Sequence, residues 1–238
     1  MVKLLLFRGS PRSNIHEVER WNKHLEDYCD VLCVRYAMEF EAYEYARGYF
    51  LNHPEYDYLV IATDDIVVTV KDIKQLKDDL EAVDYPVLSG LMNVDEKDHD
   101  DMWGNLNITY ELAAKDRRLR FYNFVKFNEL PVEDIFQVMF AGFGLTAIRR
   151  DIIEEPGFNF ASDGIFRGTG IVNGASLDLV FCWWCMEHKD EKGNPNPIPI
   201  FCDQRIHMHH LRDHGRSQVG EREKVVEING KEYPFGYV

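Results

Sequence analysis

Two adjacent carboxylates, Asp64 and Asp65, follow directly after the apolar segment 58–63. Both faces of this segment are apolar, so we expect a strand in the middle of a sheet. In open α/β sheets, ligands bind beyond the carboxyl ends of the strands, where these acids would lie. Magnesium and manganese prefer carboxylate oxygens and commonly share their remaining positions with substrate phosphates. The pair therefore predicts a divalent-metal site, unless one aspartate only caps the next helix.

Three histidines, His207, His209 and His210, close the last strand that we expect before the C-terminal tail. Alternation along a strand places His207 and His209 on one face and His210 opposite them or just past the strand end. A neutral imidazole can supply a third ligand to an ion already held by an aspartate and a diphosphate. The cluster therefore indicates metal binding, and the choice among the three histidines stays open.

Asp178 lies in the first turn of an otherwise apolar helix expected over residues 176–187, after a glycine-rich approach. A carboxylate at that position faces the helix N-terminus and any cavity next to it. It could take a proton from an attacking hydroxyl as a general base. The alternative is a capping or first-turn aspartate that only interacts with the helix dipole. Asp163 is the second candidate for the same role.

The first third of the chain alternates between strand-like and helix-like periodicity, which indicates crossover connections and a mostly parallel sheet. We expect strands over residues 3–7, 31–35, 58–63 and 86–91, and helices over residues 15–28, 39–50 and 71–82. Further strands are expected near 120–126, 137–140, 199–202 and 205–209. The sequence therefore predicts an α/β fold with helices flanking a central sheet.

Two less regular segments complete the chain. Residues 93–105 are polar and irregular, as in a substrate loop or a solvated surface loop. Near the C-terminus, Asn229-Gly230 lies between two short strand-like segments and predicts a type I′ hairpin turn. We therefore expect one domain over residues 1–215 and a C-terminal tail with a hairpin over residues 216–238.

Charge and composition narrow the class of protein. The 238 residues carry a formal net charge of -14, which would repel a nucleic-acid backbone. Five cysteines, an odd number, do not suggest a disulfide framework. The apolar run at residues 4–7 is too short for a signal peptide or a membrane span. We therefore expect a cytoplasmic protein with reduced thiols, no transmembrane segment and no nucleic-acid partner.

Four of these segments, taken in order, resemble the GT-A glycosyltransferases, in particular their family 2-like members. The acidic motif of that family is matched by Thr63-Asp64-Asp65, with Thr63 where an aspartate is common. A downstream glycine-rich segment is similar to residues 140–145, followed by a helix start at residues 148–151. The helix that carries the general base is similar to residues 176–181, and the strand leading to a metal-binding histidine is matched by residues 200–210.

The resemblance implies a GT-A fold, a Rossmann-like and mostly parallel sheet with a small antiparallel extension, and a metal-dependent, inverting glycosyltransferase. It implies Mn²⁺ or Mg²⁺ bound by Asp65 and His210, and Asp178 as the base. Its other implied residues, which contact a nucleotide-sugar donor, are Ser10, Arg12, Arg47, Asp64, Gly142 and Gly144. The acceptor would be a hydroxyl of a glycan, a lipid or a protein.

Two other classes of protein also find partial support in the sequence. The turn 9–14 after the first strand resembles the phosphate-binding turn of flavodoxin-like, NAD(P)H-dependent flavin reductases. Cysteines 182, 185 and 202 with His207 could form a structural zinc site in a non-enzymatic binding protein. The cysteine pair lies in an apolar helix, where buried thiols that act as small hydrophobic groups are the simpler interpretation.

Overall fold

The computed structural model describes residues 1–10, 16–37, 39–92, 106–107, 125, 127–155, 158, 160, 177–211 and 224–235. The helices are α1 (His16–Leu25), α2 (Glu39–Asn52), α3 (Val70–Ala82), α5 (Arg150–Glu154), α6 (Leu177–Glu187) and the 3-10 turn η1 (Phe127–Glu129). The strands are β1 (Leu4–Ser10), β2 (Asp30–Arg35), β3 (Tyr58–Ile61), β4 (Ile66–Val67), β5 (Val87–Met92), β6 (Leu106–Asn107), β7 (Ile135–Val138), β8 (Phe140–Ala141), β9 (Thr146–Arg149), β10 (Ile200–His210), β11 (Val225–Ile228) and β12 (Lys231–Pro234).

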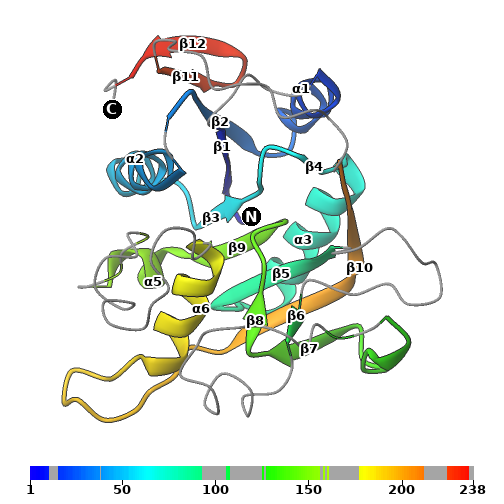
Figure 1. The fold of residues 1–238 in the computed structure, drawn as a ribbon, viewed down its shortest axis with the longest axis vertical. Coiled ribbons are helices and arrows are strands. Elements are labelled where there is room, and N and C mark those ends of the chain that lie inside the picture. The colour runs from blue at the N-terminus through cyan, green and yellow to red at the C-terminus, as the bar shows by residue number, and fades with distance from the viewer. Residues whose placement is uncertain are drawn as a thin grey trace, which may run out of the picture.

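A ten-stranded sheet crosses the molecule in the order β12-β11-β2-β1-β3-β9-β5-β10-β4, with β7 also paired to β10 (Figure 1). The pairs β1–β2, β1–β3 and β5–β10 are parallel, as the alternating first third of the chain predicts. The other pairs along this path are antiparallel, so the sheet is mixed and the prediction of a mostly parallel sheet is wrong. The α/β class itself is confirmed.

The main departure from the predicted parallel sheet is β9, which lies antiparallel between β3 and β5. We expected residues 148–151 to begin a helix, but the strand continues to Arg149 and α5 begins at Arg150. The first three residues of β9 are buried, because a strand with sheet neighbours on both sides is covered on both faces. Local periodicity cannot distinguish such a short buried strand from the start of a helix.

Helices cover both faces of the sheet and divide the core into two parts. Leu4 and Leu6 pack with α1 and α3, whereas Leu5 and Phe7 pack with α2 and α6, as strand alternation requires (Figure 1). The helix α3 begins at a capping box in which Thr69 and Asp72 satisfy each other's backbone N–H groups. The first turns of α1 and α2, like β4, follow strands whose carboxyl ends lie at one edge of the sheet.

The strand β10 is continuous, although the sequence suggested two separate strands at 199–202 and 205–209. It pairs with β5 up to Asp203 and again from His207, with a bulge in between. Gly90 makes room for this bulge, because a Cβ atom there would lie 2.7 Å from Ile206 Cγ2. After Met208 the strand leaves β5 and pairs with β4, so the end of β10 reaches the segment that contains Asp64 and Asp65.

An ion-pair network holds the bulge of β10 against α3. The Arg205 guanidinium donates to both carboxylate oxygens of Asp203, at 2.9 and 3.0 Å, and to Asp79 at 2.7 Å. Asp203 is fully buried, so Arg205 supplies the charge that such a carboxylate needs. Burial, together with a hydrogen bond to Asp203, raises the pKa of Asp79 to about 6.

The C-terminal hairpin forms where the sequence predicts it. Asn229 and Gly230 have φ angles of 47° and 74°, which is the signature of a type I′ turn. The first strand of the hairpin, β11, pairs antiparallel with β2. The Asn229 side chain accepts a hydrogen bond from Val31 N–H at 2.8 Å and ties the turn to the sheet. The hairpin therefore extends the main sheet at its β2 edge.

Several sequence predictions concern residues outside the described ranges. These are the loop 93–105, the strand near 120–126 apart from Val125, the side chain of Ser10, and the residues Arg12 and Asp163. Among the described residues, no helix is both long enough and apolar enough to cross a membrane.

Candidate functional site

The two predicted acids occupy the centre of a tight turn at the carboxyl end of β3. Ile66 N–H donates to Thr63 O at 3.3 Å, which closes a β-turn with Asp64 and Asp65 at its two central positions. We call residues 63–66 the acidic turn. Asp64 is buried and Asp65 is half-buried, so the acidic turn lies at the carboxyl edge of the sheet with one acid accessible.

A buried arginine lies directly against the acidic turn. Arg8, near the carboxyl end of β1, is 2% exposed. Its Nη1 donates to Thr63 O and to Ile66 O, both at 2.9 Å, and so bridges the first and last residues of the turn. Burial lowers the pKa of Arg8, and the negative charges of Asp64 and Asp65 oppose that change.

Sequence analysis missed Arg8. The available signal was a charged residue at the end of the apolar run 4–7, because a charge in a central strand is rarely buried without a partner. The nitrogens Nε and Nη2 of Arg8 are buried and have no hydrogen-bond partner in the described part of the chain.

The end of β10 lies beside the acidic turn, as the metal-site prediction requires. His210 pairs with Ile66 and His209 pairs with Val67. Leu211 N–H donates to Asp65 O at 2.8 Å. The side chains of His209 and His210 lie outside the described part of the structure.

His207, by contrast, belongs to the part of β10 that pairs with β5, opposite Leu91. Its ring is exposed and lies 5.3 Å from the ring centre of Phe127. The backbone therefore brings His209 and His210, and not His207, to the residues that flank the two aspartates.

The glycine-rich segment 140–145 reaches the acidic turn from the other side. Thr63 N–H donates to Phe143 O at 3.2 Å, which links the two loops directly. Gly144 N–H donates to Gly142 O at 2.8 Å, so the segment itself is a tight turn. A Cβ atom on Gly144 would lie 3.2 Å from the side chains of Met92 and Met208, so glycine allows this close approach. Gly142 and Gly144 are thus next to the predicted acids.

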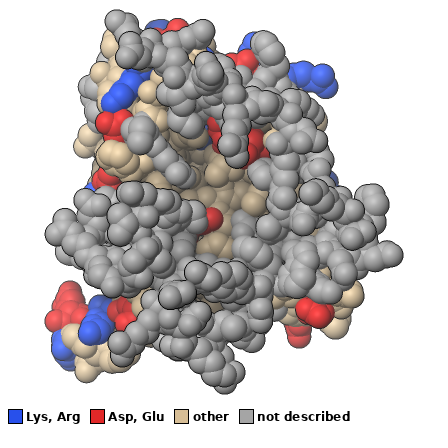
Figure 2. All heavy atoms as spheres, in the orientation of Figure 1, with Lys and Arg blue, Asp and Glu red and all other residues tan. Residues whose placement is uncertain are grey.

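The helix α6, which carries Asp178 in its first turn, packs on the same glycine-rich segment through its second turn. Cys182 Sγ donates to Ala141 O at 3.5 Å, and the ring centre of Phe181 lies 5.7 Å from that of Phe143. Asp178 is half-buried, one helical turn before these contacts. Figure 2 shows a hollow between the β3–β4 connection and α6, with an uncharged floor and acidic side chains at its rim. A carboxylate at this helix terminus can accept a proton from a group bound in the hollow.

The remaining predicted ligand contacts are less closely associated with the acidic turn. Ser10 ends β1 and pairs with Arg35 of β2, which places its backbone at the carboxyl edge. Arg47 lies on α2, with Nη1 at 3.7 Å from Glu44 and its guanidinium at 5.7 Å from the ring centre of Phe158. None of the described contacts of Arg47 reaches the acidic turn.

Tyr36, directly after β2, is a further residue of the carboxyl edge that sequence analysis missed. Its φ of 59° lies in the left-handed region, which is unfavourable for an aromatic residue. Such backbone strain is concentrated at ligand-binding sites. No local sequence signal indicates it, because the strain arises from the surroundings of the residue.

The described residues contain no group of three or more histidine, cysteine, aspartate or glutamate side chains that could hold a metal ion. This excludes a zinc site built from Cys182, Cys185, Cys202 and His207, all of which are described. Burial raises the pKa of all three thiols, so they remain protonated, as small hydrophobic groups do. At the acidic turn the described donors are the two carboxylates, a set that suits Mg²⁺ or Mn²⁺ bound mainly through substrate phosphates.

The topology also excludes the flavodoxin-like alternative. Strands β2, β1 and β3 are parallel and in the order that such a fold requires. A flavodoxin-like sheet continues with two more parallel strands. Here the next strand is the antiparallel β9, so the likeness is limited to the first three strands.

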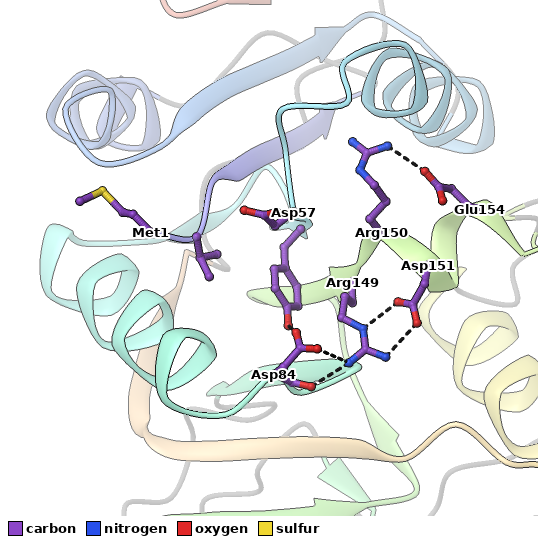
Figure 3. Close-up of a pocket in the computed structure, with 9 residues that line it drawn as sticks. Met1, Asp57, Asp84, Arg149, Arg150, Asp151 and Glu154 are labelled. Atoms are coloured by element: carbon purple, nitrogen blue, oxygen red, sulfur yellow. Dashed lines mark hydrogen bonds and ion pairs between the residues drawn. The ribbon is translucent and has the colours of Figure 1, made fainter.

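A pocket of about 580 Å³ lies at the opposite edge of the sheet, near the amino end of β3 (Figure 3). Its charged side chains neutralise one another: Arg149 binds Asp84 and Asp151, and Arg150 binds Glu154. Tyr58, the first residue of β3, donates to Asp84 at 2.7 Å. Since these groups are already paired, we assign this pocket a structural role despite its size.

Comparisons with known proteins support the fold but do not identify the chemistry of the site. No protein-family model matches the chain, and no curated protein matches it significantly. The crystal structure of A197 from STIV is similar to it, with a TM-score of 0.56 and 15% identical residues. The match covers 89% of this chain and 87% of A197. At this level of identity the likeness shows that the two chains share a mixed α/β fold.

Proposed function

We propose that this protein is a metal-dependent glycosyltransferase that transfers a sugar from a nucleotide-sugar to an acceptor hydroxyl with inversion. The observation that carries the proposal is the convergence of four distant segments at one edge of the sheet. The acidic turn contacts the end of β10 through Leu211 and the glycine-rich segment through Phe143. That segment in turn contacts the second turn of α6, the helix whose first turn carries Asp178.

In this proposal the donor diphosphate binds at the acidic turn. A divalent metal would be held by Asp65 and His210 and would neutralise the phosphate charges that develop as the sugar departs. Asp64, which is 9% exposed, would contact the ribose or a metal-bound water. The nucleoside would extend over the carboxyl ends of β1 and β2, where Ser10 and the strained Tyr36 lie.

The proposed reaction is a single displacement. Asp178 accepts the proton of the acceptor hydroxyl while the acceptor oxygen attacks the anomeric carbon. The bond between that carbon and the diphosphate oxygen breaks, its electron pair stays on the leaving nucleoside diphosphate, and the anomeric configuration inverts. The hollow between the acidic turn and α6 would accommodate the sugar between its leaving group and the base (Figure 2).

A thermal-shift panel of nucleoside diphosphates and nucleotide-sugars, each with and without Mn²⁺, tests the proposal. A ligand that binds only the folded state stabilises it and so raises the unfolding temperature. At a ligand concentration of 100 times the dissociation constant, the free energy of unfolding increases by about 2.7 kcal/mol. We expect stabilisation by at least one nucleoside diphosphate, and only with the metal. Asp65→Ala should abolish this effect, whereas Asp151→Ala, at the opposite edge of the sheet, should retain it. Metal-independent binding, or equal binding by Asp65→Ala, would contradict the proposal.

A further inference from the structure

Arg8 has the geometry of a residue that shapes the acidic turn. One nitrogen, Nη1, donates to the carbonyls on both sides of the acid pair, Thr63 O and Ile66 O, at 2.9 Å each. Those carbonyls belong to the first and last residues of the β-turn, so the two contacts constrain its ends from outside. The backbone that carries the two aspartates is thereby constrained at both ends.

The other two nitrogens of the Arg8 guanidinium make no hydrogen bonds with described residues that would offset their burial. The residue is only 2% exposed, so water does not reach Nε and Nη2 freely, and these two nitrogens have no hydrogen-bond partner in the described part of the chain. Buried arginine charges cost free energy unless they are paired and fully hydrogen-bonded. An apolar side chain at this position would avoid that cost, as Leu4 and Leu6 do on the same face of β1.

Arg150 shows what a structurally optimised arginine looks like in the same protein. Its Nε donates to Tyr56 O at 2.7 Å, and its Nη2 donates to Phe50 O and His53 O at 3.0 and 2.8 Å. Its Nη1 pairs with Glu154 at 3.1 Å. Both arginines bind backbone carbonyls, but only Arg150 uses all three of its nitrogens.

We infer that Arg8 is a positioning residue that pre-forms the acidic turn for its ligand and is retained for that purpose at a cost in stability. The inference deepens the proposed function, because the ligand would be the metal–diphosphate group of the donor. Arg8 does not contact the reacting atoms; it acts through the orientation of Asp64 and Asp65. Its guanidinium also supplies a fixed positive charge beside the two acids.

Amide hydrogen exchange on the metal-free protein tests the positioning role without any ligand. Arg8→Met removes both carbonyl contacts and the charge, while a side chain of similar length fills the space. The amides of Ile66 and Leu211, which report on the acidic turn, should then exchange roughly tenfold faster, because a lost buried hydrogen bond corresponds to about that factor. The amides of β3 should keep their protection. Arg150→Met is the matched control and should leave the acidic turn unchanged.

Arg8→Lys is the second variant, because it keeps the positive charge but loses the planar geometry that bridges two carbonyls. Exchange at Ile66 should fall between the wild-type and Arg8→Met rates. If Arg8→Met does not fold, Arg8→Lys decides by itself: faster exchange confined to the acidic turn supports the inference. Wild-type exchange rates in either folded variant would overturn it.

A ligand experiment separates this inference from the proposed function. The stabilisation of each variant by UDP or GDP with Mn²⁺ should rank wild type and Arg150→Met above Arg8→Lys, and Arg8→Lys above Arg8→Met. A wild-type protein that binds neither these nor any other nucleoside diphosphate would overturn the proposed function, whereas the exchange rates would still decide the role of Arg8. Full metal-dependent binding by Arg8→Met would overturn the positioning role, even if its exchange were faster.

Discussion

The arginines that lie near the two ends of the parallel strands have opposite hydrogen-bonding situations. At the amino edge, Arg149 and Arg150 bind carboxylates and backbone carbonyls through every nitrogen of their guanidinium groups. Figure 3 shows their carboxylate partners. At the carboxyl edge, Arg8 bridges two carbonyls with one nitrogen and leaves the other two without described partners. The first arrangement is what stability alone favours, and the second is tolerated where a site needs a particular shape.

The same comparison shows that the volume of a pocket does not by itself indicate a functional site. The amino-edge pocket measures about 580 Å³, but its acids and bases already neutralise one another. The carboxyl edge brings an acidic turn, a histidine-bearing strand end, a glycine-rich segment and the helix α6 together from four parts of the chain. On the basis of this convergence, we propose that the function lies at the carboxyl edge.

The largest expected effect comes from removing the proposed base. Asp178→Asn should keep donor affinity and lose on the order of 10²–10⁴ in turnover, because a base acts on the acceptor proton and contributes little to donor binding. Initial rates and a donor titration measure the two effects separately. Asp151→Asn, an acid of the amino edge, should keep both. Full activity in Asp178→Asn would remove this residue from the mechanism, and retention of anomeric configuration would contradict single displacement.

The next effect concerns the metal. His210→Ala should weaken Mn²⁺ affinity roughly 10-fold or more, since even outer contacts of metal sites are worth 10–100-fold. His207→Ala should change it little, because His207 lies opposite Leu91 and beside Phe127. Calorimetric titration with Mn²⁺ in the presence of a bound nucleoside diphosphate gives the comparison. A larger loss in His207→Ala would move the ligand role away from the end of β10.

A smaller effect concerns the free energy of unfolding, which should depend more on Arg150 than on Arg8. Arg150→Met should reduce the free energy of unfolding by about 2–3 kcal/mol, because three backbone carbonyls lose a charged donor. Arg8→Met should reduce it by less, since it removes the donor from two backbone carbonyls and also removes a buried charge, two of whose nitrogens have no described partner. Urea titrations of both variants test the order. A greater loss in Arg8→Met would show that Arg8 contributes mainly to stability.

The smallest expected effect is on the pH dependence of the free energy of unfolding, through Asp79, which lies against the bulge of β10. Burial raises the pKa of Asp79 to about 6, so the folded state holds this proton more tightly than the unfolded state does. The associated stability is fully present below about pH 4 and is lost as the pH rises through 6. Compared with Asp79→Asn, the wild type should therefore lose stability between pH 4 and pH 7. Asp78→Asn, an exposed neighbour on α3, should follow the wild-type profile in the same urea titrations.

Local patterns in the sequence determined several features of this protein correctly. The alternation of strand and helix periodicity predicted β1, β2 and β3 and the helices between them, because each pattern depends only on which side of its own element is buried. The Asn229-Gly230 pair predicted the hairpin, since few residues adopt positive φ at both central positions of a turn. An apolar strand followed by two acids predicted the place of the acidic turn at the carboxyl edge of the sheet.

Only the tertiary structure decided how these elements combine. No local pattern shows that β9 would insert antiparallel between β3 and β5, or that β10 would stay continuous through a bulge and reach β4. The partners of Arg8 are 55 and 58 residues away in the sequence, so its role depends on strand order and not on its neighbours. Periodicity records whether a residue is buried, whereas the long-range pairing of strands determines which buried residues meet.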